Sequence, residues 1–212
     1  MKGSENKEIK DLKVFESWVK EGNQLLMHRE YVAALICYDT ALELNTDDAR
    51  VWDNRGVALS GAGRYTDAIE SFEISLDLKP DNFQAWSNMG VSMAALKRFE
   101  EAINCFNRAL DIKPEDGDAW NNKGSVLFSL SKYSEALESF DNALKLNPED
   151  AKAWGGKGSV LKFTGDYEDS MKCLEKFIEL ASEDTSGVIS SQIEEAWAMI
   201  FDLKLLLNQK NG

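Results

Sequence analysis

A tryptophan recurs every 34 residues along most of this chain. Five tryptophans keep this spacing, and they are Trp18, Trp52, Trp86, Trp120 and Trp154. Only one of the six tryptophans in the sequence lies outside the register. A fixed period of this length is typical of repeat proteins, in which each unit buries its apolar face against its neighbours. The chain therefore predicts an array of similar units with one continuous core.

Other positions keep the same register. Each tryptophan is followed four residues later by a glycine, and these are Gly22, Gly56, Gly90, Gly124 and Gly158. A glycine inside a helix costs about 1 kcal/mol relative to alanine, so the recurring glycines predict places where two helices approach closely. Later in each unit come an aromatic and a small residue: Tyr31, Tyr65, Phe99, Tyr133, Tyr167 and Ala34, Ala68, Ala102, Ala136, Ser170. Pro80, Pro114 and Pro148 close the three middle units.

With these residues, the sequence resembles the tetratricopeptide repeat family. The resemblance implies an all-α fold, a right-handed α-solenoid of five helix-turn-helix repeats with a concave groove. The expected units are residues 15–48, 49–82, 83–116, 117–150 and 151–184. The family usually has a leucine just before the glycine, where this chain has Glu21, Arg55, Met89, Lys123 and Lys157. We therefore expect looser or more polar packing at that position.

Different segments flank the repeats. Residues 1–14 form a charged lead that we expect to be partly frayed, although apolar residues in it could extend the first helix backward. Residues 185–212 predict a linker over 185–191 and then an amphipathic capping helix. Its stripe comprises Ile189, Ile193, Trp197, Ile200, Leu203 and Leu207. Further apolar residues lie off this stripe, namely Met199, Phe201, Leu205 and Leu206. This excess either packs on the fifth unit or is offered to a partner.

The charge and the apolar content exclude some classes of partner. The net charge of −13 argues against nucleic acid, because phosphate contacts require clustered Lys and Arg. An acidic surface can also serve only to keep the protein in solution. No apolar run approaches the roughly 18 residues that a membrane span needs, and the first fourteen residues lack a signal peptide's apolar segment. We therefore expect no membrane partner and a cytoplasmic location.

Nothing in the sequence predicts catalysis, a cofactor or a metal site. Cys37, Cys105 and Cys173 lie 68 residues apart. Equivalent positions two repeats apart are on the order of 20 Å from one another, which is too far for a disulfide, and the spacing fits no metal motif. We expect the cysteines to fill space between helices. The single histidine, His28, lies in a polar turn, and no nucleophile with a base and no phosphate-binding loop is found.

The first helix of each unit is predicted to line the groove with the face opposite its tryptophan and glycine. Asn54, Asn88 and Asn122 occupy one equivalent position there. An amide offers a donor and an acceptor, so such a ladder can pair with the backbone of an extended peptide. It resembles the asparagine ladder of O-linked GlcNAc transferases, although asparagine could simply be common there in the family. The predicted binding set is Lys20, Asn23, Arg50, Asn54, Gln84, Asn88, Asn121, Asn122, Ser125, Phe128 and Lys152, and Phe163 lies on the same face in the fifth unit.

One peptide-binding mode of the family is not expected. Heat-shock co-chaperones of this family hold a terminal carboxylate with asparagines and basic residues. Asn23 and Asn54 match the asparagines, but Val19, Gln84 and Asn88 stand at the basic places. We therefore predict a non-enzymatic protein–protein interaction scaffold that binds an extended peptide or a partner helix in its concave groove. The alternative is a structural self-assembly module that forms a weak homo-oligomer through the C-terminal helix.

Overall fold

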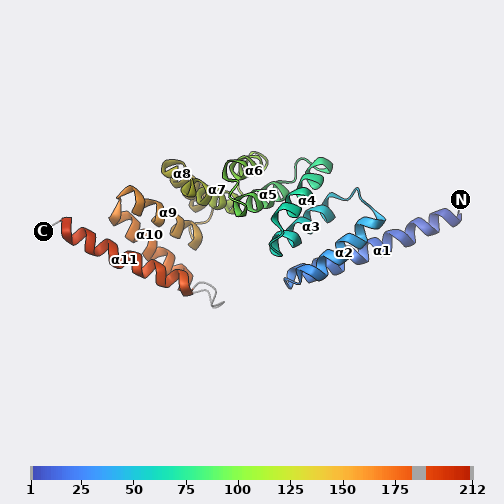
Figure 1. Ribbon diagram of the computed structural model, residues 1–212, viewed down its shortest axis with the longest axis horizontal. Helices are drawn as coiled ribbons and strands as arrows, with labels where there is room; N and C mark the ends of the chain where they lie inside the picture. Colours follow the sequence, from blue (N-terminus) through green and yellow to red (C-terminus); the bar gives the residue numbers. More distant parts are fainter. Residues whose placement is uncertain (1, 183–189, 211–212) are drawn as a thin grey trace. The chain divides into compact units, whose positions relative to one another are not determined.

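The structure, a computed structural model, describes residues 2–182 and 190–210 (Figure 1). In these residues it contains eleven α-helices and no strand, which confirms the predicted all-α fold. The helices are α1 (Lys2–Met27), α2 (Tyr31–Leu44), α3 (Ala49–Gly61), α4 (Tyr65–Leu78), α5 (Phe83–Ala95), α6 (Phe99–Ile112), α7 (Gly117–Ser129), α8 (Tyr133–Leu146), α9 (Ala151–Thr164), α10 (Tyr167–Ser182) and α11 (Ser190–Lys210). None of them is both long enough and apolar enough to cross a membrane.

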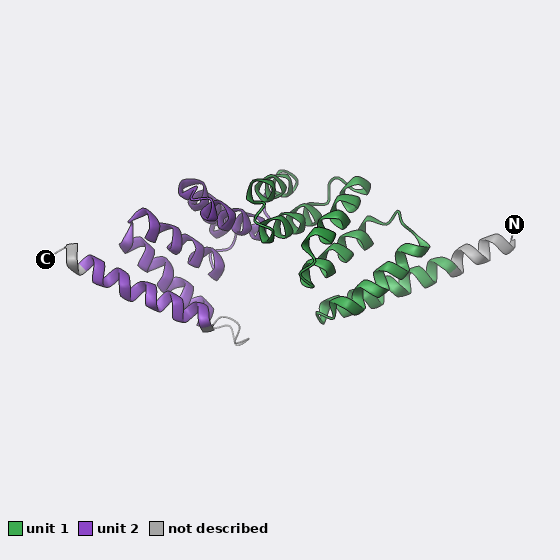
Figure 2. Ribbon diagram, viewed as in Figure 1, with its two compact units in different colours: residues 1–113 green, residues 114–212 purple. Residues whose placement is uncertain are grey.

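The helices group into two compact units, residues 1–113 and residues 114–212, which are described separately (Figure 2). The first unit holds the pairs α1–α2, α3–α4 and α5–α6. The second holds α7–α8, α9–α10 and α11. Within each unit a helix packs against its partner in the pair, and the second helix of a pair packs against the first helix of the next. This is the nearest-neighbour packing of a repeat array.

Where one helix pair meets the next, a side chain caps the N-terminus of the first helix of the following pair. The carboxylate of Asp48 accepts a hydrogen bond from the amide of Arg50. Asn82, Asp116 and Asp150 accept in the same way from the amide three residues further on. Such caps satisfy amide groups that have no partner inside the helix.

The recurring tryptophans fasten the first helices to these junctions. Four of the five recurring indoles, all half-buried, donate a hydrogen bond from Nε1 to the backbone carbonyl six residues earlier. The acceptors are Thr46 for Trp52 (2.8 Å), Pro80 for Trp86 (2.9 Å), Pro114 for Trp120 (2.9 Å) and Pro148 for Trp154 (2.8 Å). The register of tryptophan therefore reflects one repeated contact between a helix and the loop before it.

The recurring glycines lie where a large side chain of the paired helix meets the backbone. A Cβ atom on Gly56 would lie 2.6 Å from the ring of Phe72, which is fully buried. Gly22, Gly90 and Gly124 meet Tyr38, Phe106 and Phe140 in the same way. In the fifth pair Leu174 replaces the aromatic residue, and a Cβ on Gly158 would lie 3.0 Å from it. The predicted close approach of the two helices is present in each pair.

The two ends of the chain bear on open points of the sequence analysis. Helix α1 begins at Lys2, so the first helix extends backward through the charged lead, which was one of the two possibilities for this segment. The predicted linker lies outside the described residues up to residue 189, and Ser190 and Ser191 belong to α11. Helix α11 packs on α10 through Ala196, Ile200 and Leu203, which are at most 1% exposed. Ile189, the first residue of the predicted stripe, also lies outside the described residues.

Trp197 was expected on the buried stripe of α11, and that prediction is wrong. Its side chain is 53% exposed, and the adjacent Ala196 takes the inward place at 1% exposure. Residues one apart on a helix point about 100° away from each other, so burying one of this pair turns the other away. Alanine allows α11 to lie closer to α10 than an indole would.

Candidate binding face

The first helices of neighbouring pairs lie side by side within each unit. Helix α3 contacts α1 and α5 in residues 1–113, and α7 contacts α9 in residues 114–212. Side chains also join them, since Ser92 of α5 donates to the hydroxyl of Ser60 of α3 at 3.2 Å. These helices carry the predicted groove residues. We call the surface that they form the first-helix face of each unit.

Two of the predicted asparagines meet in the first unit. Asn54 donates from Nδ2 to Oδ1 of Asn23 at 2.9 Å, and the same oxygen accepts from the hydroxyl of the buried Tyr38, also at 2.9 Å. The oxygen of Asn23 is thereby occupied. The carbonyl oxygen of Asn54 accepts no hydrogen bond from the described part of the chain. Asn54 is half-buried and keeps one acceptor toward the solvent.

Asn88 hydrogen-bonds to the half-buried carboxylate of Asp53 on the neighbouring first helix, α3. Burial raises the pKa of Asp53 above its ordinary value, and hydrogen bonds from Asn82 and Asn88 act in the opposite direction. Oδ1 of Asp53 is buried and has no partner within the described residues. The amide of Asn88 therefore has a structural contact between α3 and α5 in addition to any role toward a ligand.

Arg50 links α1 and α3 by charge. Its Nη2 lies 2.6 Å from the carboxylate of Asp48 and 3.4 Å from that of Glu16. The hydrogen bond from Arg50 is the main reason why the pKa of Asp48 is lowered. Lys20 and Gln84, the other predicted residues of this unit, are exposed. All six predicted residues of the first unit thus lie on its first-helix face, but Arg50, Asn23 and Asn88 already have internal partners.

Asn121 in the second unit does not line a groove. Its side chain is only 5% exposed, and its amide donates to the carboxylate of Asp150, the capping residue of α9. The prediction for Asn121 is wrong because the residue directly after the tryptophan faces the neighbouring first helix. There it fastens α7 to α9.

The other predicted residues of the second unit reach the surface. Asn122 is half-buried, while Ser125 and Lys152 are exposed. The hydroxyl of Ser125 donates to the carbonyl of Asn121, one turn earlier, at 3.0 Å. Its hydrogen is therefore used inside the helix, and its oxygen is left as an acceptor.

Three aromatic rings gather beside these polar residues. The ring of Phe128 lies 5.3 Å from that of Phe163, and Tyr133 lies 6.1 Å from both. We call Phe128, Tyr133 and Phe163 the aromatic cluster. Phe163 is 65% exposed. Phe163 was predicted to lie on the groove face, whereas Tyr133 was not. The residues equivalent to Phe163 in the three preceding units are small, namely Gly61, Ala95 and Ser129.

The residue types that most often take part in catalysis or metal binding, such as cysteine and histidine, do not lie together. Cys37, Cys105 and Cys173 are free and 4% exposed, and burial raises the pKa of the Cys105 thiol to about 11. His28 is exposed at the turn after α1. Within residues 2–182 and 190–210, no three His, Cys, Asp or Glu side chains come together as a metal site would require.

Family comparisons agree with the repeat register. Models described as tetratricopeptide repeat match residues 19–83 and 54–117, residues 117–150 and residues 151–184. Together they cover most of the chain, from residue 19 to residue 184. A search of curated proteins by sequence found no match.

Several solved structures share the fold. The pilF protein of Pseudomonas aeruginosa has a TM-score of 0.74 at 19% identity, with 94% of this chain and 92% of that chain covered. MamA from Desulfovibrio magneticus RS-1 has a TM-score of 0.73 at 20% identity, covering 82% and 98%. YrrB, described as a TPR protein with an unusual peptide-binding site, has a TM-score of 0.64 at 24% identity, covering 78% and 86%. The chain belongs to the tetratricopeptide repeat family, whose fold is in general that of a protein–protein interaction scaffold.

Proposed function

We propose that this protein is a non-enzymatic scaffold that binds an extended peptide or a partner helix on its first-helix face. The aromatic cluster is the observation that carries the proposal. A ring that is 65% exposed, as in Phe163, and that packs on two further rings offers a rigid apolar anchor at little cost in side-chain entropy. YrrB, a protein of the same fold described as having a peptide-binding site, is consistent with this use of the family's scaffold.

An amide group supplies the polar part of the proposed interaction. The half-buried side chain of Asn122 belongs to the same compact unit as the aromatic cluster. An amide oxygen accepts a hydrogen bond from a backbone N–H whatever the side chain of the partner is. Recognition would then combine hydrogen bonds to the backbone of the peptide, which do not depend on its sequence, with one apolar contact at the aromatic cluster.

The anchor can be tested with peptides selected from a displayed library of random linear sequences. Peptides that bind the native protein should bind Phe163→Ser about tenfold more weakly, because an aromatic anchor typically contributes more than about 1 kcal/mol. The matched control is Val32→Ser, which removes a side chain that is 72% exposed on a second helix. Equal binding by both variants would place the bound peptides on another surface.

The amide contribution has its own test. Asn122→Ala should weaken the same peptides by about 0.5–1.5 kcal/mol, the value of one lost hydrogen bond, measured by calorimetry. An unfolding midpoint close to the native value would show that the loss belongs to binding. Unchanged affinity would remove Asn122 from the proposed site.

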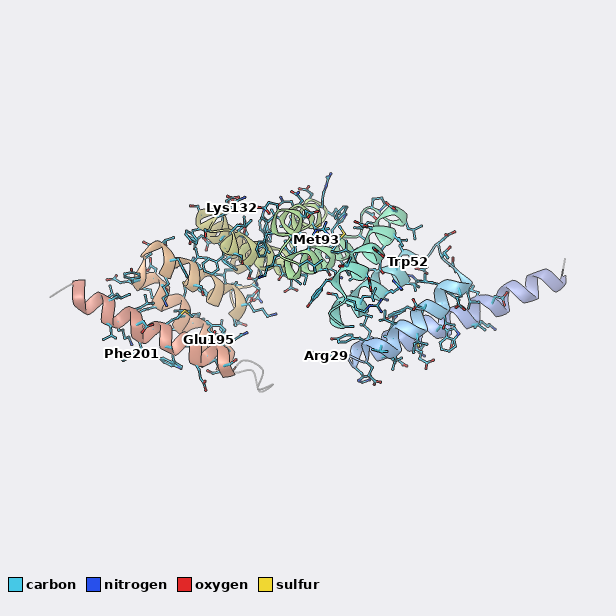
Figure 3. The ribbon with its side chains drawn as sticks, in the orientation of Figure 1. Arg29, Trp52, Met93, Lys132, Glu195 and Phe201 are labelled. Atoms are coloured by element: carbon cyan, nitrogen blue, oxygen red, sulfur yellow. The ribbon has the colours of Figure 1, made fainter. Side chains whose placement is uncertain are left out.

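A second candidate function is self-association through α11. Trp197, Phe201 and Leu205 are spaced four residues apart and are 53%, 63% and 47% exposed. Figure 3 labels Phe201 on α11. They form an apolar ridge on the side of α11 that does not pack on α10, and such a surface is typical of an interface. The ridge favours this candidate.

Light scattering distinguishes this candidate from a cap that only covers α10. If the ridge is an interface, the native protein has the mass of a dimer, and Phe201→Ser with Leu205→Ser converts it into a folded monomer. The control is Ile36→Ser, which changes an apolar residue that is 61% exposed on α2. A native protein that stays monomeric at high concentration would exclude the candidate.

A further inference from the structure

A cation between a carboxylate and an indole recurs at two junctions of helix pairs. Arg55 of α3 pairs with Asp39 of α2 at 2.7 Å, and Lys157 of α9 pairs with Asp141 of α8 at 2.6 Å. Each cation also lies near the ring of the tryptophan three residues earlier, at 5.7 Å for Arg55 and 6.0 Å for Lys157. These are the polar contacts expected where the family usually has leucine. A carboxylate and an indole together hold a cation by charge and by the ring quadrupole.

The junction of α4 and α5 keeps the carboxylate and the indole but lacks the cation. One period after Asp39, Trp52 and Arg55 stand Glu73, Trp86 and Met89. Methionine carries no charge, and Glu73 has no ion pair with any described residue. Trp86 still donates to the carbonyl of Pro80 at 2.9 Å, so its indole is fixed as in the other repeats.

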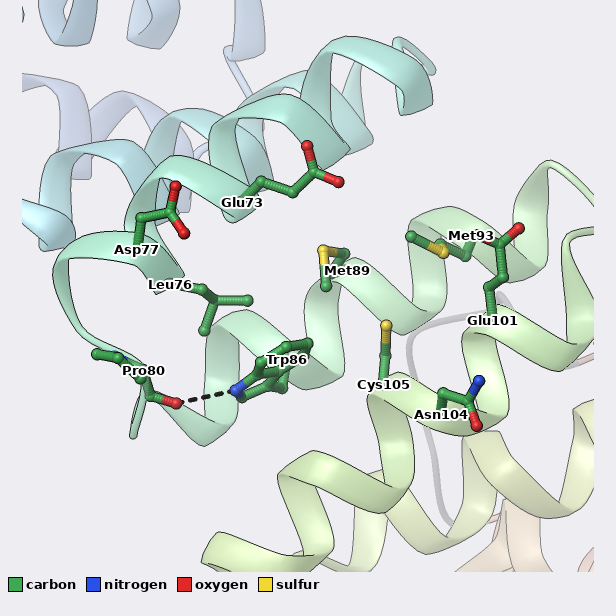
Figure 4. Close-up of a pocket in the computed structure, with 10 residues that line it drawn as sticks. All are labelled: Glu73, Leu76, Asp77, Pro80, Trp86, Met89, Met93, Glu101, Asn104 and Cys105. Atoms are coloured by element: carbon green, nitrogen blue, oxygen red, sulfur yellow. Dashed lines mark hydrogen bonds between the residues drawn. The ribbon is translucent and has the colours of Figure 1, made fainter.

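A cavity of about 590 Å³ lies at this junction (Figure 4). Met89, Met93 and Cys105 contribute apolar, sulfur-containing side chains from α5 and α6, and Trp86 closes one side. Methionine is a flexible and polarisable side chain that adapts to an inserted group. The cavity has the size and apolar character of sites that accept a ligand side chain.

The rim of the cavity is acidic. Glu73 and Asp77 line it from α4, and Glu101 lines it from α6. Glu101 is paired with Arg98 at 2.6 Å, whereas Asp77, like Glu73, has no ion pair with a described residue. Arg108 lies at an adjoining hollow together with Trp86 and Asp111. The apolar cavity therefore has on one side two carboxylates, Glu73 and Asp77, that form no ion pair with a described residue, although Arg98 lies close enough to Glu73 to interact with it by charge.

We propose that this cavity binds an arginine side chain of a partner protein, flanked by apolar residues, and that its guanidinium takes the place between Glu73 and Trp86 that Arg55 takes between Asp39 and Trp52. The methylene groups of the arginine pack on Met89 and Met93, because a long cationic side chain buries its stem while its charged end stays at the acidic rim. Arginine fits better than lysine, since its planar group both stacks on a ring and bonds a carboxylate at two points. This pocket is lined by α4, α6 and the side of α5 that carries Trp86 and Met89, so it is distinct from the first-helix face.

The experiment uses the full chain and a synthetic peptide with one arginine between two leucines in a serine–glycine background. Calorimetry should show binding that weakens about tenfold when citrulline, a neutral group of the same shape, replaces the arginine. Glu73→Gln should weaken binding by a similar factor. Glu70→Gln, which changes another exposed carboxylate of α4, should leave binding unchanged. No binding, or equal binding of the citrulline peptide, overturns the proposal.

A second variant places the missing cation on the protein itself. Met89→Arg recreates the residue found at the equivalent position in α3, so the variant should fold, and its arginine should occupy the pocket and abolish peptide binding. Unchanged binding by a folded Met89→Arg protein contradicts the proposal. Asn54→Ala should leave this peptide's affinity unaltered, which separates the result from that for the first-helix face.

Alkylation locates the peptide independently of its affinity. Cys105 lines the cavity, whereas Cys37 and Cys173 lie in other helix pairs with the same 4% exposure. The arginine peptide should slow the reaction of Cys105 with iodoacetamide and leave the other two cysteines unchanged, as followed by mass spectrometry. Equal protection of all three thiols, or none, would mean that the peptide does not occupy this cavity.

Discussion

The turn between the two helices of each pair places one residue in the left-handed region of the backbone. The positions recur with the period of the repeat: Arg29, Gly63, Lys97, Ser131 and Gly165, with φ between 59° and 91°. Glycine adopts this conformation freely, but a side chain costs about 1–2 kcal/mol there. Because two of the five residues are glycine in register, the sequence itself suggests the backbone conformation of the other three. The strain at the non-glycine turns is therefore predictable from the repeat register.

Lys97→Gly should stabilise the protein. The expected gain in the free energy of unfolding is about 0.5–1 kcal/mol, since relief of the left-handed strain exceeds the added entropy of the unfolded chain. Urea unfolding measures it. Lys97→Ala is the matched control, because it removes the same side chain and keeps the strain. A similar gain in the alanine variant would show that the lysine side chain, not the backbone, is unfavourable.

A glycine in a helix pair should be intolerant of a methyl group. The Cβ of Gly56→Ala would lie 2.6 Å from the fully buried ring of Phe72, so the ring must move and stability should fall by about 1–3 kcal/mol. Gly117→Ala meets nothing within 4 Å at the start of α7, and its helix propensity should leave stability equal or slightly higher. Thermal unfolding of the two variants compares them. Equal midpoints would mean that the pair can separate to accept the methyl group.

At the level of whole elements, α11 shows where periodicity alone is insufficient. The apolar pattern allowed Trp197 in the buried stripe, but the structure buries Ala196 and leaves the indole 53% exposed. Alanine contributes little to a hydrophobic pattern, so the sequence does not mark it as a contact. The choice between the two depends on how closely α11 approaches Phe177 and Ala181 of α10, and that distance is a property of packing.

The two sides of α11 should respond differently to truncation of a side chain. Leu203 is fully buried against α10, and Leu203→Ala should cost about 2–5 kcal/mol through lost burial and the cavity that remains. Phe201→Ala removes a larger side chain that is 63% exposed, and it should change stability by about 0.5 kcal/mol or less. Chemical denaturation of both variants at low protein concentration measures the difference. A larger loss at Phe201 than at Leu203 would contradict this assignment of the buried face.

For the molecule as a whole, the fold was predictable and the candidate site only partly so. Helix pairs follow from the register, because tryptophan, glycine and capping residues each make the same local contact in successive repeats. The binding face depends on contacts between repeats that no single unit encodes. Asn121 was predicted to line the groove, but its amide bonds to Asp150 of the next pair. The register shows that Met89 stands where α3 has Arg55, but only the structure shows that Glu73 forms no ion pair with a described residue.

Nearest-neighbour packing also predicts which helices a destabilising core substitution affects. Leu59 of α3 and Leu127 of α7 are both at most 1% exposed, and replacing either with alanine should cost about 2–5 kcal/mol. Because residues 1–113 and 114–212 are separate compact units, Leu59→Ala should speed amide hydrogen exchange mainly in α2 to α5 and leave α9 to α11 protected. Leu127→Ala should do the reverse, so each variant is the control of the other. Hydrogen exchange read by mass spectrometry tests this, and a uniform loss of protection over both units would mean that the chain unfolds as one cooperative body.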